Sequence, residues 1–566
     1  MAQLAYESGL AITRPDGSTI PIPIGAVPLV VDDRDIESLN RVAVLLTHAT
    51  LRVARWRMAP ERRDATLAAL SPTERRVIAA TWHRDAGLAV ARVDFLGSAT
   101  RQALEVNATI PAMQAYSDIA AAAWLSTHAS DIRKVGALLA ANGSNSEALL
   151  QALLDLYERQ RGGSPRTIAL LCRRLDAQRT ELLYLRERFE AAGFDARLVH
   201  PEDLTWDGSR GLLRHRGQAL DLVYRHIFLR LLDEAPAPAV EAALMHDRPN
   251  GTLVLNPASA HLEMKSTHAF LSQAADDDRL SADIGLTDDE RAIVQRHVPW
   301  TRMLHSAQLS ERELKEVVAR VSAEPAEFVL KRSWSYGGNE VFVGAAVAEV
   351  AGNSGGSPQE YDLSARSWAQ RIEQAAGDHR SGGFVVQRRV RSPRSRQLLC
   401  TPNHVQSAEV ITDYAAFATL GAAPSWTGVA RAASGEIVNL ARGGVLVPVI
   451  RRSVLEALQA TRAQHGLRQL VVGHVAAAPH CANQFVARKR PLALFHHVGR
   501  EVEHAPWRFQ RPALTQEVAR VGVQLEMVES VDHGRAPPMA RACFARPRIL
   551  PPHPKQPAPE GMNLCG

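Results

Sequence analysis

The stretch Arg92-Val-Asp-Phe95, followed by Leu104-Glu-Val-Asn107 and Pro111, places oxygen-bearing side chains on two short runs of strand-forming residues. The Gly97-Ser98 pair between the runs predicts a turn that makes the two strands neighbours. Glu105 and Asn107 are two positions apart, so both side chains leave the same face of their strand. Together with Asp94 they offer the hard oxygen ligands that Mg²⁺ prefers. A solvated polar face explains the same residues, so the pattern permits a metal site without requiring one.

A second informative stretch is Lys331-Arg-Ser-Trp-Ser-Tyr-Gly-Gly-Asn-Glu-Val341. It predicts a β-hairpin in which a lysine ends the first strand and Gly337-Gly338 lie in the turn. Glycine lets the backbone approach phosphate oxygens closely, and lysine adds a mobile positive charge. Such a hairpin can cover the phosphates of a nucleotide, although a surface hairpin with a Gly-Gly turn has the same pattern. No GxxxxGK[ST] loop occurs in the sequence, so a P-loop is excluded.

Weaker signals follow in a definite order along the chain. Lys265 opens a predicted helix, and Gln387 to Val390 end a predicted strand whose backbone can face an adenine edge. Arg431 and the run from Asn439 to Gly443-Gly444 come later. Each of these features has an ordinary structural explanation when it is taken alone, and only their succession indicates a nucleotide site.

This succession resembles the circularly permuted ATP-grasp group, in particular the synthetase domain of glutathionylspermidine synthetase. The first stretch is similar to the "RFDF … LLEYNADTP" pattern of that family. In ordinary ATP-grasp enzymes the metal-binding E-x-N strand ends the domain, whereas here it precedes the lysines, as circular permutation implies. The resemblance covers about residues 25–450.

The resemblance assigns roles to individual residues. Asp94, Glu105 and Asn107 would hold Mg²⁺, and Arg92 would stabilise developing negative charge, with Arg431 as a second catalytic residue. The remaining expectations are ATP binding by Lys265, Lys331, Gly337, Gly338, Gln387 and Val390, and a place near the substrate for Tyr224, Arg225 and Asn439.

The activity that the resemblance implies is ATP-dependent ligation. With ATP and Mg²⁺, a small-molecule or peptide carboxylate would become an acyl phosphate and then react with an amine. The alternative is a catalytically inactive nucleotide-binding or interaction protein, because the sequence after Gly444 no longer follows the family. Arg332 and Gln387 also stand where the family usually has proline and glutamate. The identities of the acid and the amine, and the oligomeric state, are not predicted.

Composition bounds the remaining classes. The 566 residues are 46% hydrophobic and 22% charged with a net charge of +6, typical of a soluble protein of several domains. The mild charge and the lack of a basic stripe with interleaved aromatics argue against nucleic-acid binding. The five cysteines form no CxxC pair, so neither a disulfide framework nor a structural zinc site is expected. No signal peptide or membrane span is expected, which predicts a cytoplasmic protein; the alanine- and arginine-rich composition is typical of a GC-rich bacterial genome.

The predicted fold class is α/β (α+β), a circularly permuted ATP-grasp with a preceding small α/β domain and a helical N-terminal region. The predicted domains are a helical region with the metal-binding strands (1–160), a pre-ATP-grasp-like α/β domain (161–260) and an ATP-grasp region (261–450). Within the second, residues 167–172, 180–192 and 196–200 read as strand, helix and strand. The tail, 451–566, is rich in His, Arg and Pro and is either poorly ordered or a frame-shifted reading.

Overall fold

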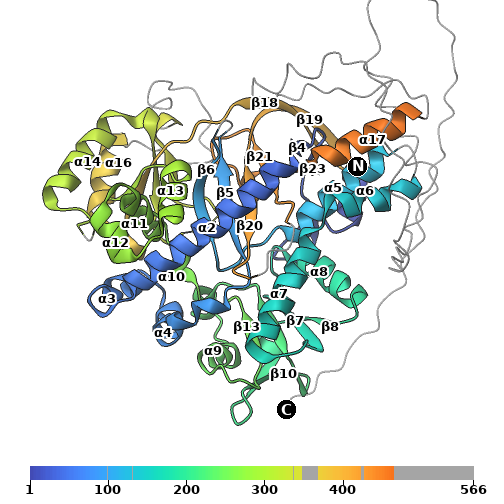
Figure 1. Ribbon diagram of the computed structural model, residues 1–566, viewed down its shortest axis with the longest axis horizontal. Helices are drawn as coiled ribbons and strands as arrows, with labels where there is room; N and C mark the ends of the chain where they lie inside the picture. Colours follow the sequence, from blue (N-terminus) through green and yellow to red (C-terminus); the bar gives the residue numbers. More distant parts are fainter. Residues whose placement is uncertain are drawn as a thin grey trace, which may run out of the picture. The chain divides into compact units, whose positions relative to one another are not determined.

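The computed structural model describes residues 1–97, 100–129, 132–306, 308–335, 337–346, 368–421 and 426–464. This part of the chain mixes helices and strands (Figure 1), which confirms the predicted α/β class. Residues 347–367 and most of the predicted tail lie outside the described residues. The described start of the tail is a helix, α17 (Arg452–Gln464). Within the described ranges, no helix has the length and apolarity that crossing a bilayer requires.

A four-stranded parallel sheet has the order β13-β12-β7-β8. Strand β7 (Thr167–Leu171) is followed by helix α8 (Arg179–Ala191) and strand β8 (Asp195–Val199), close to the predicted strand–helix–strand unit. Strands β12 (Leu222–Arg225) and β13 (Leu253–Leu255) complete the sheet, and both are buried along their length. Such continuous burial is expected for a parallel sheet covered on both faces.

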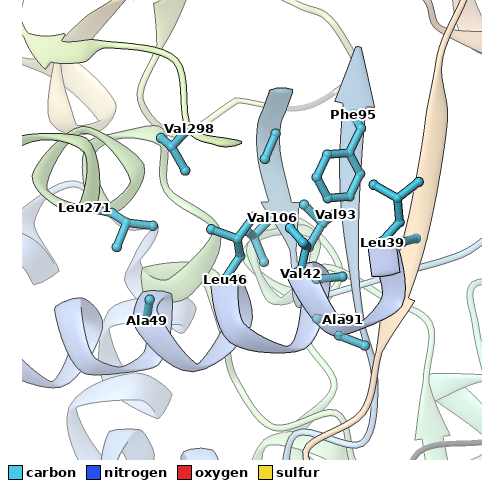
Figure 2. Close-up of a cluster of buried hydrophobic side chains, with 14 of the residues drawn as sticks. Leu39, Val42, Leu46, Ala49, Ala91, Val93, Phe95, Val106, Leu271 and Val298 are labelled. Carbon is cyan, nitrogen blue, oxygen red and sulfur yellow. The ribbon is translucent and has the colours of Figure 1, made fainter. Parts of the chain in front are cut away.

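A second, antiparallel sheet contains the two runs Arg92–Phe95 and Leu104–Asn107. Strand β5 (Ala91–Leu96) lies between β6 (Gln102–Asn107) and β20 (Tyr414–Ala418). The long helix α2 (Asp33–Arg57) packs on one face, as Figure 2 shows for Leu39, Val42 and Leu46 against Val93, Phe95 and Val106. One face of the sheet therefore packs in the apolar core, and the polar side chains of β5 and β6 project from the other face.

The lysine hairpin belongs to a third sheet, with the order β14-β17-β15-β16. Its strands are β14 (Thr301–Met303), β15 (Phe328–Arg332), β16 (Val341–Val343) and β17 (Phe384–Arg388). Helices α14 (Glu311–Ala323) and α16 (Trp368–Gly377) share an apolar cluster with the side chains of one face. Helix α11 (Lys265–Asp276) packs against β14 and β17 from the other side.

Early and late parts of the chain are joined by strand pairing. A closed barrel has the order β18-β19-β21-β22-β3, and β4 pairs in parallel with β23. The early strands are β3 (Ile24–Gly25) and β4 (Leu29–Val31); the late ones are β18 (Arg394–Thr401), β19 (His404–Thr412), β21 (Ala430–Ala433), β22 (Val445–Val447) and β23 (Val449–Arg451). Residues 437–440 form no strand: a bend at Ile437 leads into the 3₁₀-helix η7 (Leu440–Arg442). The predicted domain boundaries stay predictions.

Helix ends follow local capping chemistry. Ser71 and Glu74 form a capping box at the start of α4 (Pro72–Thr81). Helix α5 (Gln114–His128) begins after Met113, which has a left-handed conformation with φ of 93°. The remaining helices and strands are α1 (Ala2–Glu7), α3 (Pro60–Ala68), α6 (Val135–Asn142), α7 (Asn145–Arg161), α9 (Pro238–Met245), α10 (Ala260–Glu263), α12 (Asp278–Ile284), α13 (Asp288–His297), β1 (Ala11–Thr13), β2 (Thr19–Pro21), β9 (Leu204–Asp207), β10 (Leu212–His215) and β11 (Gln218–Ala219).

Candidate functional site

The polar face of the β5–β6 pair carries four of the predicted site residues. The antiparallel register places Arg92 opposite Asn107 and Asp94 opposite Glu105. Residues directly opposite in an antiparallel pair project from the same face, and here α2 covers the other face. The register shift follows these two pairs, between Asp94 and Phe95, where Leu104 is the extra residue on β6.

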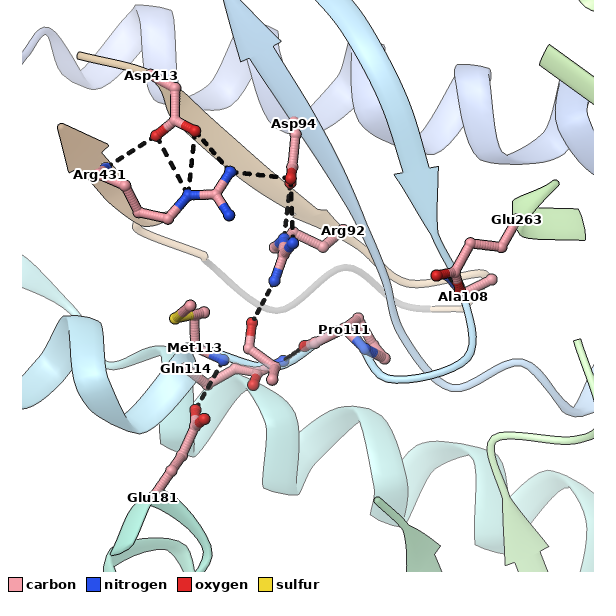
Figure 3. Close-up of polar contacts among 11 residues, drawn as sticks. Arg92, Asp94, Ala108, Pro111, Met113, Gln114, Glu181, Glu263, Asp413 and Arg431 are labelled. Carbon is pink, nitrogen blue, oxygen red and sulfur yellow. Dashed lines mark hydrogen bonds and ion pairs between the residues drawn. The ribbon is translucent and has the colours of Figure 1, made fainter. Parts of the chain in front are cut away.

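A buried network of two arginines and two aspartates begins on this face (Figure 3). Arg92 binds both oxygens of Asp94, with Nε–Oδ1 and Nη2–Oδ2 distances of 2.7 and 3.0 Å. Arg431 on β21 donates to Asp94 Oδ2 at 2.9 Å and to Asp413 Oδ2 at 2.5 Å. All four residues are buried, so the two positive and two negative charges balance one another away from water.

The network sets the ionisation of its members. Burial alone would raise the pKa of Asp94, but the charges of Arg92 and Arg431 outweigh it and bring the pKa down to about 2. Burial raises the pKa of Asp413, against the effect of Arg431. The two aspartates raise the pKa of Arg431 despite its burial. This arrangement departs from the metal-ligand role predicted for Asp94, because its oxygens already accept hydrogen bonds from two cations.

A second group forms around Glu105 from three other segments of the chain. Lys265, the first residue of α11, places Nζ 3.3 Å from Glu105 Oε2 and donates to the Ser335 carbonyl at 3.0 Å. Lys331 at the end of β15 donates from Nζ to Gln387 Oε1 at 2.6 Å. Gln387 in turn donates to the hydroxyl of Thr301 at 3.1 Å. The structure thus brings together two lysines, a glutamine and a carboxylate that lie far apart in the sequence.

Burial tunes the charges in this group. It lowers the pKa of Lys331 to about 8, and the nearby charge of Lys265 acts in the same direction. Burial would raise the pKa of Glu105, but the charges of Lys265, Lys331 and Arg92 together outweigh it and the pKa is lowered. At neutral pH the group therefore holds a carboxylate beside two ammonium groups, and the net positive charge suits a polyanion.

The glycine turn lies beside the segment that follows β21. Gly337 and Gly338 have φ values of 67° and 73°, a region that favours glycine. A Cβ on Gly338 would come within 3.1 Å of the Ile437 side chain and 3.2 Å of the Arg442 Nε. In the adjoining loop the Asn439 carbonyl accepts the backbone N–H of Gly444 at 3.0 Å. Asn439 lies in the sequence between Ile437 and Arg442, the two residues next to Gly338.

Val390 lies just beyond the end of β17. A Cβ on Gly97, the residue that follows β5, would come within 3.4 Å of the Val390 side chain. The backbone N–H groups of Arg388 and Arg389 already bond to the carbonyls of Trp300 and Glu327, at 2.8 and 2.7 Å. An adenine edge at this strand would therefore have to use backbone groups other than these two donors.

Arg225 has a structural place that differs from the predicted substrate contact. Its guanidinium donates to the carbonyls of Asn256, Ile227 and Pro257, with distances of 3.2 Å to Asn256 and 2.7 Å to Pro257. The side chain is fully buried, so it holds the ends of β12 and β13 together rather than facing a ligand. The neighbouring Tyr224 is also buried, and its hydroxyl has no hydrogen-bond partner among the described residues.

Two buried glutamates beside the site were not predicted from the sequence. Glu181 on α8 accepts the backbone N–H groups of Met113 and Ala115 at 2.7 and 3.3 Å, at the start of α5. The carbonyl of Ala112, just before α5, accepts a hydrogen bond from Arg92 Nη1 at 3.0 Å. Glu263 accepts the N–H groups that follow β6, from Ala108 at 3.1 Å and Thr109 at 2.8 Å. A glutamate in a helical segment carries no sequence signal for such a contact.

Glu181 predicts a measurable pH dependence of stability. Burial raises its pKa to about 8, so the native state keeps a proton that the unfolded state loses near the ordinary glutamate pKa of about 4.3. Stability should therefore fall as pH rises between these values, by at most ~1.4 kcal/mol per pH unit. We expect Glu181→Gln, which can still accept both N–H groups, to remove this slope in thermal denaturation at pH 5 to 8. Glu187→Gln, exposed on the same helix, is the control; an unchanged slope in Glu181→Gln would contradict the assignment.

A separate cavity lies away from the groups around Asp94 and Glu105. It has a volume of about 310 Å³ and is lined by Leu244, Leu255 and the paired Arg161 and Asp247, among others. None of the predicted site residues lines it, and its two charges already neutralise each other. The candidate site is therefore the pair of groups around Asp94 and Glu105.

These features define a mixed α/β protein in which a parallel sheet precedes a lysine-bearing antiparallel sheet. Residues 24–273 match the family described as glutathionylspermidine synthase preATP-grasp. The match confirms the resemblance over these residues, which include β5, β6, the parallel sheet and Lys265.

Comparison with solved structures finds weaker likenesses. A glutathione synthetase-like effector from Globodera pallida has 12% identity and a TM-score of 0.48, with 80% of this chain and 95% of that chain covered. A D-alanyl-alanine synthetase A from Vibrio cholerae O1 biovar eltor has 13% identity and a TM-score of 0.22, with 43% and 66% covered. Scores of this size carry no weight for function. No curated protein matches the sequence.

Proposed function

We propose that this protein is an ATP-dependent carboxylate–amine ligase that works through an acyl phosphate. The observation that carries the proposal is the convergence of Lys265, Lys331 and Gln387 on Glu105, a residue of the strand that the family match covers. Buried ammonium groups beside a carboxylate suit a site that holds a polyphosphate together with its metal. These four residues come from four separate segments of the chain, β6, α11, β15 and β17.

ATP would enter as a substrate of this site. Lys265 and Lys331 would contact its phosphates, and the turn at Gly337-Gly338 would cover them. Lys265 would then exchange its contacts with Glu105 and the Ser335 carbonyl for phosphate oxygens. Gln387 to Val390 would border the adenine, as the resemblance implies.

The donor set fits one Mg²⁺ ion at Glu105 and Asn107. Asn107 has a buried side-chain amide nitrogen without a partner among the described residues, and the oxygen and nitrogen of such an amide exchange by a simple flip. Its amide can therefore turn its oxygen to a ligand, next to the Glu105 carboxylate on the same face. A bound Mg²⁺ supplies charge neutralisation to the phosphoryl oxygens. Asp94 stays with its arginines.

The chemistry needs positioning rather than a side-chain nucleophile. An oxygen of the substrate carboxylate forms a bond to the γ-phosphorus as the bond to ADP breaks. The amine nitrogen then forms a bond to the acyl carbon, and phosphate leaves as the nitrogen loses a proton. Arg92, held by Asp94 and the Ala112 carbonyl, would stabilise the negative charge that develops on the carboxyl oxygens.

A second candidate is a catalytically inactive protein that still binds the nucleotide. The observation in its favour is the saturation of Arg92, Asp94, Arg431 and Asp413 by one another. A site whose catalytic arginines are neutralised can keep its phosphate contacts and lose the reaction. Tight ATP binding without ADP release, across a broad set of acids and amines, would select this candidate.

The metal assignment is tested by Glu105→Gln, which removes the charge and keeps the size. We expect ATP to bind wild-type protein more tightly with Mg²⁺ than with excess EDTA, and this gain to fall about tenfold or more in the variant. Calorimetry under both conditions measures it. Glu409→Gln, on the exposed part of β19, is the matched control. An equal Mg²⁺ gain in Glu105→Gln and wild type would remove Glu105 from the metal site.

A further inference from the structure

His268 is a buried polar side chain that the proposed reaction leaves without a role. It lies on α11 one turn after Lys265, and the residue is 6% exposed. Neither ring nitrogen makes a hydrogen bond to the described residues. The backbone of Ala103 is near enough to affect the imidazole pKa, but it does not meet the geometry of a hydrogen bond.

The imidazole borders a small cavity that also touches the candidate metal ligand. The cavity has a volume of about 10 Å³, and its lining includes Glu105, Lys265, His268 and Thr50. A volume of this size is close to the least that holds one water molecule, which needs two to four polar partners. Glu105, Lys265 and His268 supply an acceptor, a donor and a group that can do either.

Several charged groups lie around His268 and the cavity. The groups that act on the imidazole electrostatically are Lys331, Glu105 and Lys265. Lys331 is bonded to Gln387, and Glu263, which also lines the cavity, accepts two backbone N–H groups through Oε2. Glu105 is the carboxylate of this lining that acts on the imidazole electrostatically, and a water beside His268 can orient it.

Stability alone gives no reason for an imidazole at this position. A buried polar group without a partner destabilises the folded state. The cavity lining also includes the apolar residues Val106, Leu262 and Met264, so an apolar side chain at position 268 would find contacts there. The polar group therefore fits a role beyond packing.

We propose that His268 is a positioning residue that holds the Glu105 carboxylate, through one water in this cavity, in the orientation that binds Mg²⁺. The inference rests on the proposed function, because it refers to the same metal site. It adds a residue that the sequence analysis did not select and that touches neither ATP nor the metal.

The test uses the full chain with three substitutions. His268→Leu removes the hydrogen-bonding atoms, His268→Gln keeps them, and His48→Leu makes the same change on α2 at a half-buried histidine that does not line the cavity. For each protein, ATP affinity is measured by calorimetry with Mg²⁺ and with excess EDTA, and Tm is measured by thermal denaturation.

We expect His268→Leu to lose about tenfold of the affinity gain due to Mg²⁺, the size found for groups that orient metal ligands. Its Tm and its affinity in EDTA should equal or exceed those of wild type, and His268→Gln and His48→Leu should keep the Mg²⁺ gain. The proposal is overturned if His268→Leu keeps the affinity gain due to Mg²⁺. It is also overturned if His268→Gln loses as much of this gain as His268→Leu and has a lowered Tm, because that result indicates a packing role. Absence of ATP binding by folded wild type overturns the proposed function itself and the inference with it, and it is seen without any variant.

Discussion

Replacing Lys331 by methionine is expected to weaken Mg²⁺-dependent ATP binding by about a hundredfold, or ~2.7 kcal/mol. Lys331 is buried, and its ammonium group donates to Gln387 at the centre of the lysine group. Methionine keeps most of the apolar stem and removes the charge, so packing should survive while the phosphate contact is lost. Calorimetry with ATP and Mg²⁺ measures the effect. Lys315→Met, on the exposed face of α14, is the control.

The same lysine predicts the pH dependence of binding. Its pKa is lowered to about 8 by burial, so the ammonium form dominates at pH 7 and is lost as pH rises through 8 to 9. ATP affinity of the wild type should fall over this range, and the affinity of Lys331→Met should not follow it. Equal binding by Lys331→Met and wild type at pH 7 would show that Lys331 makes no phosphate contact.

Asp94→Ala is expected to destabilise the fold by about 3–5 kcal/mol, the cost typical of removing one partner from a buried ion pair. The substitution leaves Arg92 without its carboxylate and Arg431 with Asp413 alone, so a net positive charge stays buried. Urea denaturation of the variant and wild type measures the difference. Asp195→Ala removes an exposed ion pair with Arg197 and should change stability little.

The double variant Arg92→Leu with Asp94→Leu separates charge balance from packing. It removes one cation and one anion together, and apolar replacements of a buried pair are often neutral or stabilising. We expect it to be more stable than Asp94→Ala. A double variant as unstable as the single one would show that the hydrogen bonds of this pair, rather than the charge left behind, hold the region together.

Acid provides an independent measure of the same network. The pKa of Asp94 is about 2 in the native state, against about 3.9 for an unperturbed aspartate. Its contribution to stability is therefore present above pH 4 and is lost as pH falls towards 2. The loss should be missing in Asp94→Asn, whatever its stability at neutral pH.

Local signals in the sequence were sufficient for the individual elements of the site. Glycine placement and residue periodicity predict the pairing of β5 with β6, the hairpin with Lys331 and the helix that starts at Lys265. These patterns depend on neighbours within a few residues, which is the range over which backbone preferences act. Residues 437–440 show where such local prediction fails. A short run that contains Ile437, Val438 and Leu440 is typical of a strand, yet it pairs with no strand among the described residues and leads into a 3₁₀-helix.

Contacts between distant segments were not accessible in the same way. Asp94 and Arg431 are 337 positions apart, and no local pattern states that the aspartate would be held by two arginines instead of a metal. Glu181 and His268 likewise look like ordinary helical residues until the fold buries them beside the site. The sequence by itself determined which strands, turns and helices form and which polar residues they carry. Only the tertiary structure decided the partners of those residues, because burial and pairing of charges depend on which segments pack together.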